Sequence, residues 1–135
     1  MEPRVRVKQE AVLPGAASEL RQVTWRIENL GDRPLKILAA RCPHGKFRSG
    51  EREFSVPVVL EANQSAAIEL EVDCKESSGT VVENAFLILR VVWAGKPWLI
   101  LARMRVLVNK KGVPETVTEL ITSQPVGFSL RETAG

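Results

Sequence analysis

The sequence contains no tyrosine, one histidine and two cysteines, and aromatic residues make up only 5% of its 135 residues. Structural zinc sites need four ligands, commonly cysteine and histidine in pairs, whereas Cys42, His44 and Cys74 supply three. A copper site would want further histidine or methionine, and Met104 is expected inside the core. We therefore expect no bound metal and no cofactor.

The residue patterns that carry catalysis are also lacking. Cys42 and His44 lie two residues apart and would share a face of a strand, but no orienting third group or oxyanion loop accompanies them. Glu69, Glu71 and Asp73 alternate with apolar residues, so we expect a solvated strand face where nothing desolvates the carboxylates. No glycine-rich loop follows a strand and opens a helix. The sequence predicts no catalytic residue and no enzymatic activity.

Long uncharged apolar runs are missing as well. Arg90, Lys96, Arg103 and Arg105 interrupt the most hydrophobic stretch, which is therefore not expected to span a membrane. The first residues lack the apolar segment of a signal peptide. A cytoplasmic protein is the default expectation, although a domain excised from a larger exported protein would show the same pattern. The net charge of +3 and pI near 9.1 are too mild for a nucleic-acid footprint.

What the chain does contain is a series of short extended segments separated by turn residues, which is typical of an all-β sandwich. Val23, Trp25 and Ile27 alternate with polar residues, and Ala66–Cys74 alternates in the same way. We expect about seven antiparallel strands, with a polar loop at Pro43–Glu53 that could include a weak edge strand. The expected strands are Arg4–Leu13, Gln22–Asn29, Leu35–Cys42, Phe54–Leu60 (at an edge, because it contains Pro57), Ala66–Cys74 and the two strands of the hairpin described next.

The stretch NAFLILRVVWAGKPWLILARMRVLV, residues 84–108, predicts a hairpin around a four-residue AGKP loop. That loop would set Trp93 against Trp98. Odd positions from Ala85 to Trp93 and even positions from Trp98 to Val106 are then all apolar, so this face is the predicted core face. A slip of one residue would push arginines into the core, which fixes the orientation of the two faces.

The opposite face of the hairpin combines large apolar side chains with three arginines. Arginine stems could lie over their apolar neighbours on an ordinary wet surface, or the C-terminal segment could fold back and cover them. Alternatively, the face is a binding surface, because contiguous exposed apolar patches mark interfaces, and arginine and aromatic residues are enriched there. The candidate interface residues are Phe86, Ile88, Arg90, Val92, Leu99, Leu101, Arg103 and Arg105.

The sequence leaves two further features undecided: the state of the two cysteines and the structure of the C-terminal segment. Cys42 and Cys74 are expected near the same end of the sandwich, and they could form a disulfide only if their Cα atoms come within about 7 Å; we expect free thiols. Residues 1–112 are expected to form the sandwich, and 113–135 a C-terminal tail that either packs on it or is partly disordered. PETVTELITSQ in this tail suits a short helix or another strand.

The segments VTWRIENLGDRPLKI (Val23–Ile37) and LEANQSAAIELEV (Leu60–Val72), followed by the last hairpin, resemble bacterial immunoglobulin-like sandwiches of the CARDB and major-sperm-protein-like kind. The likeness covers about residues 4 to 108. It implies an immunoglobulin-like β-sandwich that serves as an interaction or spacer module, with no catalytic residues to carry over. The unusually apolar last hairpin and the segment after Asn109 depart from the pattern.

The sequence thus favours a structural or protein-binding module that contacts a partner protein, or a second copy of itself, through the outer face of the last hairpin. A nucleic-acid-binding sandwich that uses the arginines of the same face is the alternative. Aliphatic residues do not stack on bases, so we expect protein contact. No small-molecule substrate is evident.

Overall fold

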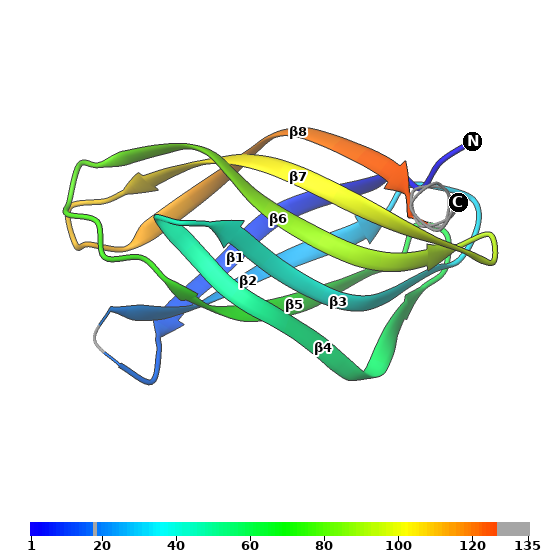
Figure 1. Ribbon diagram of the computed structural model, residues 1–135, viewed down its shortest axis with the longest axis horizontal. Coiled ribbons are helices and arrows are strands. Elements are labelled where there is room, and N and C mark those ends of the chain that lie inside the picture. Colours follow the sequence, from blue (N-terminus) through cyan, green and yellow to red (C-terminus); the bar gives the residue numbers. More distant parts are fainter. Residues whose placement is uncertain (18, 127–135) are drawn as a thin grey trace, which may run out of the picture.

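The computed structural model describes residues 1–17 and 19–126. In this part of the chain all regular structure is β-strand, and the strands pair antiparallel, which confirms the all-β prediction (Figure 1). There are eight strands, one more than expected. They are β1 (Val5–Pro14), β2 (Leu20–Asn29), β3 (Leu35–His44), β4 (Phe47–Leu60), β5 (Ser65–Asp73), β6 (Val81–Trp93), β7 (Lys96–Val108) and β8 (Pro114–Pro125).

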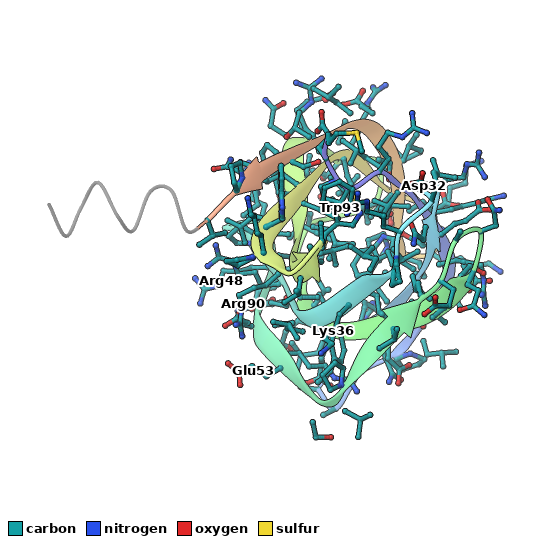
Figure 2. The ribbon with its side chains drawn as sticks, turned by 90° about the vertical axis from the view of Figure 1, so that its right-hand side faces the viewer. Asp32, Lys36, Arg48, Glu53, Arg90 and Trp93 are labelled. Atoms are coloured by element: carbon teal, nitrogen blue, oxygen red, sulfur yellow. The ribbon has the colours of Figure 1, made fainter. Side chains whose placement is uncertain are left out.

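The strands follow one another in a single nearly closed sheet, in the order β1-β2-β5-β4-β3-β6-β7-β8. Side chains join its two ends: the Thr116 backbone N–H donates to Gln9 Oε1 at 2.8 Å, and Thr118 Oγ1 donates to the Val7 carbonyl at 3.0 Å. Figure 2 shows the ribbon surrounding a centre filled with side chains. The sheet is also weakly joined between β4 and β5, where only Arg48 and Asp73 pair within the described chain.

The core arises from the two-residue alternation of the strands. Val23, Trp25 and Ile27 on β2 are fully buried, as their alternation predicts, because successive strand residues point to opposite faces. The Trp25 ring packs edge-to-face on Phe47 with centroids 6.2 Å apart. Its indole N–H donates to Thr116 Oγ1 at 3.0 Å, so the buried donor is satisfied.

The loop predicted at Pro43–Glu53 is wrong for most of its length, and the alternative of a strand within it is realised as the start of β4. The chain turns at Gly45 and Lys46 and returns at once as β4, with Phe47 buried in the core. The sequence of this strand looks like a loop because most of its first residues are polar or glycine and face solvent. Further along, the pairing with β3 passes from Ala39↔Glu53 to Ile37↔Val58. The extra residues on β4 make a bulge, where Figure 1 shows the strand turning a sharp corner.

The hairpin between β6 and β7 is tighter than predicted. Ala94 and Gly95 form a two-residue turn with φ of 51° and 72°, and Trp93 pairs with Lys96 instead of Trp98. Both turn residues adopt the left-handed conformation that two-residue hairpins of this kind require. The AGKP loop was therefore too long by two residues. Because the side-chain period is also two, the faces stay as predicted.

Asn29 fixes the turn between β2 and β3. It is 1% exposed, and its Nδ2 donates to the carbonyls of Arg33 at 2.8 Å and Leu60 at 3.0 Å. Its Oδ1 accepts the Gly31 N–H at 2.9 Å. One amide thereby holds a turn against the end of β4, with both its donor and acceptor groups satisfied.

The part of the predicted tail that the structure describes forms β8, which pairs with β7 along its whole length. Thus PETVTELITSQ is a strand and not a helix, and it extends the sheet. Residues 127–135 of the same predicted tail lie outside the described residues.

Candidate functional site

The predicted assignment of the hairpin faces is confirmed. On the inner side, Leu87, Leu89 and Val91 of β6 and Ile100, Ala102 and Met104 of β7 are fully buried. The eight candidate interface residues share the opposite side, which we call the hairpin outer face. They meet across the two strands as Phe86↔Arg103, Ile88↔Leu101 and Arg90↔Leu99.

These eight residues differ in how far they reach solvent. Ile88 is 9% exposed and lies between Arg41 of β3 and Leu101 of β7. Its neighbours on the face cover it, as expected if long side chains lie over apolar residues on an ordinary solvated surface. Arg105 is exposed, and the others are half-buried, namely Phe86, Arg90, Val92, Leu99, Leu101 and Arg103.

Strand β8 widens the apolar surface. Val117 is 63% exposed and Leu120 is 48% exposed, and they lie beside Arg105 and Arg103 of β7. Leu107 and Val81, which pair with each other, are also exposed on this side. The described part of the tail therefore lies beside the outer face and adds to it, instead of folding back over it.

Sequence reasoning missed the contribution of β8 because threonines occupy the inner positions of that strand. Thr116 and Thr118 face β1 and bond with Gln9 and Val7, so both faces of the strand look partly polar in the sequence. The available signal was the run Thr116, Val117 and Thr118, because consecutive β-branched residues favour a strand.

Two of the three outer-face arginines are engaged in ion pairs. Arg90 Nη2 lies 3.1 Å from Glu53 Oε1, and its Nε lies 3.4 Å from Glu51 Oε1. Figure 2 shows Arg90 and Glu53 on the same flank of the molecule. Arg105 Nε lies 3.1 Å from Glu83 Oε1. Arg103 forms no ion pair with any described residue, and its Nε is buried without a hydrogen-bond partner.

The turn end of the hairpin carries the two tryptophans. Trp93 and Trp98 pack edge-to-face with ring centroids 5.9 Å apart, and the Arg33 guanidinium lies 5.9 Å from the Trp93 ring centre. A depression of about 350 Å³ is bordered by these three residues and Lys96. The pair closes the end of the core, where Trp93 is buried.

The Cys42 and His44 pair lacks the features of a nucleophile and its base. Burial raises the pKa of the Cys42 thiol to about 12, so the thiol is protonated near neutral pH. His44 Nδ1 instead accepts the Lys46 backbone N–H at 3.2 Å. Cys42 and Cys74 are both free thiols. Burial also raises the pKa of Cys74.

The buried Cys42 predicts a specific loss of stability in alkali. An unfolded thiol ionises near 9.0, whereas the folded one resists ionisation until about 12. The contribution of the neutral thiol to stability is therefore complete below pH 9 and is lost as the pH rises towards 12. At pH 11 the loss amounts to about 2–3 kcal/mol. Urea unfolding under reducing conditions measures it. Cys42→Val should weaken the dependence on pH, and an unchanged slope would contradict the assignment.

No group of three or more histidine, cysteine, aspartate or glutamate side chains placed to hold a metal ion occurs among residues 1–17 and 19–126. Those residues also include no helix with the length and apolar character needed to cross a bilayer. No family model matches the chain, and no curated protein matches its sequence.

Proposed function

We propose that the protein is a non-enzymatic interaction module of the immunoglobulin-like sandwich type, and that it contacts a protein partner or a second copy of itself through the hairpin outer face. The carrying observation is the exposed apolar surface that spans three adjacent strands. Val117 and Leu120 of β8 extend the surface on β6 and β7. Contiguous apolar patches of this kind mark interaction sites on water-exposed domains.

The distribution of charge supports protein contact over nucleic-acid contact. Arg90 is paired with Glu53 of β4 and Arg105 with Glu83 of β6, so they offer less free positive charge to phosphates. A nucleic-acid interface needs several uncompensated cations, whose released counterions drive binding. Arg103 remains without an ion pair in the described chain and is half-buried among apolar neighbours. Arginine so placed is common at protein interfaces.

The test compares two valine-to-glutamate substitutions at exposed positions. Val117→Glu places a carboxylate on the outer face, whereas Val56→Glu does so at the corner of β4, where Val56 is 79% exposed. Leu101→Glu is a second change on the face. We expect Val117→Glu and Leu101→Glu to weaken association by about tenfold or more, and Val56→Glu to have no effect.

Sedimentation velocity over a range of concentrations tests association with a second copy, and affinity capture with wild-type protein as bait tests other partners. Circular dichroism and urea unfolding check that each variant is folded. A wild type that stays monomeric and recovers no Val117-dependent partner would contradict the proposal. Binding of an oligonucleotide that falls steeply with salt would favour the nucleic-acid alternative.

A further inference from the structure

Among the strands that are neighbours in the sheet order, β4 and β5 share the fewest paired residues. Only Arg48 and Asp73 pair between them, because the bulge carries β4 away from its neighbour. Over residues 65–72, β5 therefore pairs with β2 on one side and, within the described chain, with no strand on the other. We call this place the β4–β5 opening.

A single side-chain contact reveals which backbone groups face the opening. Arg52 Nη1 donates to the Glu69 carbonyl at 2.6 Å, so the main-chain groups of Glu69 point towards β4. In an antiparallel strand the N–H and C=O of one residue point to the same side, and residues two apart share it. The main-chain groups of Ala67 and Glu71 consequently face the opening as well.

Arg52 takes the place of a strand at this edge. Its guanidinium satisfies one β5 carbonyl and lies 5.3 Å from the centre of the Phe54 ring. Because Arg52 is exposed, its long side chain can leave at small cost. Charged side chains are a common way to blunt a sheet edge, and this one blocks only part of the open edge.

The opening has an apolar side and an acidic side. A depression of about 350 Å³ has apolar walls from Phe54 and Val58 of β4 and Ile68 of β5, and Thr24, Arg52, Ala67 and Glu69 complete its border. Glu69 and Glu71 alternate with the buried residues of β5 and form no ion pair within the described part of the chain. Glu71 Oε2 accepts the Ala16 backbone N–H at 3.0 Å.

From this arrangement we infer that the β4–β5 opening binds an extended peptide strand whose side chains alternate between apolar and basic. Its main chain bonds with Ala67, Glu69 and Glu71 and displaces Arg52. Its apolar side chains enter the depression, and its basic side chains lie opposite Glu69 and Glu71, where opposite charges on cross-strand neighbours are favourable. Addition of a strand to an exposed edge is a recurrent mode of peptide recognition.

The probe is a fluorescent peptide of about nine residues that alternates valine and lysine, long enough to span the open edge at about 3.3 Å per residue. Its matched control replaces every lysine with glutamate. Fluorescence anisotropy with the full chain should show binding of the lysine peptide and at least about tenfold weaker binding of the glutamate peptide. Equal binding of both peptides, or no binding of the lysine peptide, would overturn the inference.

Variants of the protein test the geometry. Arg52→Ala should tighten binding several-fold because it removes the competing side chain, and the double change Glu69→Lys with Glu71→Lys should reverse the peptide preference. Ala67→Pro removes an N–H that faces the opening and spares those that face β2, so it should abolish binding. Amide NMR shifts at Ala67, Glu69 and Glu71 of the wild type give the same information without mutation.

The site lies apart from the hairpin outer face, so failure of one proposal is distinguishable from failure of the other. Leu101→Glu should leave peptide affinity unchanged, and Arg52→Ala should leave self-association unchanged. If the peptide instead shifts the amides of β6 and β7, it binds the outer face and the strand-addition inference is wrong.

Discussion

Asn29→Asp is expected to lower the free energy of unfolding by about 3–5 kcal/mol at neutral pH. The side chain is 1% exposed, and its Nδ2 lies 2.8 Å and 3.0 Å from the carbonyl oxygens of Arg33 and Leu60. A carboxylate has no hydrogen to give these carbonyls. The substitution would leave two acceptors unpaired and place a negative charge beside them, where little water can screen it.

A matched change separates this effect from the general consequences of adding a charge. Asn63 lies in the turn between β4 and β5, is exposed and has φ of 66°, a conformation that aspartate tolerates. Asn63→Asp should therefore change stability by less than about 0.5 kcal/mol. Urea unfolding followed by tryptophan fluorescence compares the two variants. The Asn29 variant should recover part of its stability in acid, because a protonated carboxyl group can donate again.

Equal midpoints for Asn29→Asp and the wild type would mean that the amide does not hold the turn. In that case the junction of β2, β3 and β4 would depend on its backbone bonds, such as those from Asn29 N to the Gln64 carbonyl and from Asn63 N to the Asn29 carbonyl. The structure contains both kinds of bond, and the comparison measures how much of the stability comes from the Asn29 side chain.

The alternation of apolar residues was enough to predict β2, β5 and both strands of the hairpin, and which way they face. Val23, Trp25 and Ile27 are spaced by two and are all buried, and the same rule oriented both strands of the hairpin. It works there because one face of each strand is strongly apolar, so a slip by one residue would bury charge. The period of two also explains why a register error of two residues left the faces unchanged.

The pattern failed at the start of β4 and left β8 open between a helix and a strand, because both sides of these strands look polar. The start of β4 and the whole of β8 expose many polar groups, and their inner positions include Ser49, Thr116 and Thr118. The two threonines bond with long-range partners: Thr116 bonds with Gln9 and Trp25, which lie far away in sequence. Local periodicity carries no information about a partner that the fold brings in from the other end of the chain.

The candidate sites follow the same division. The hairpin outer face could be proposed from the sequence, since its residues alternate with the core within one hairpin. The β4–β5 opening could not, because it depends on a bulge that changes the pairing between Ile37↔Val58 and Ala39↔Glu53. Pro57 predicted an edge strand, but β4 lies between β5 and β3 in the sheet order, and only its part after Arg48 pairs, within the described chain, with β3 alone. Proline does not indicate how far a strand departs from its neighbour.

The second large effect is expected at Val106 of β7, which is fully buried, next to Leu107, which is 45% exposed. Val106→Glu would place a carboxylate in the core with no partner. We expect a loss of at least about 4 kcal/mol, a large share of the 5–15 kcal/mol that stabilises a typical domain. Leu107→Glu adds the same group one residue later on the outer face and should cost less than about 1 kcal/mol.

The two variants are compared by circular dichroism and by the yield of folded protein, with urea unfolding of whichever folds. Orientation alone distinguishes them, because the substituted side chains are both aliphatic, the introduced group is the same and the positions are adjacent. Val106→Glu should be unfolded or strongly destabilised, and Leu107→Glu should fold like the wild type. Similar losses at both positions would show that the outer side of β7 is as closely packed as the core, and a surface so covered could not receive a partner.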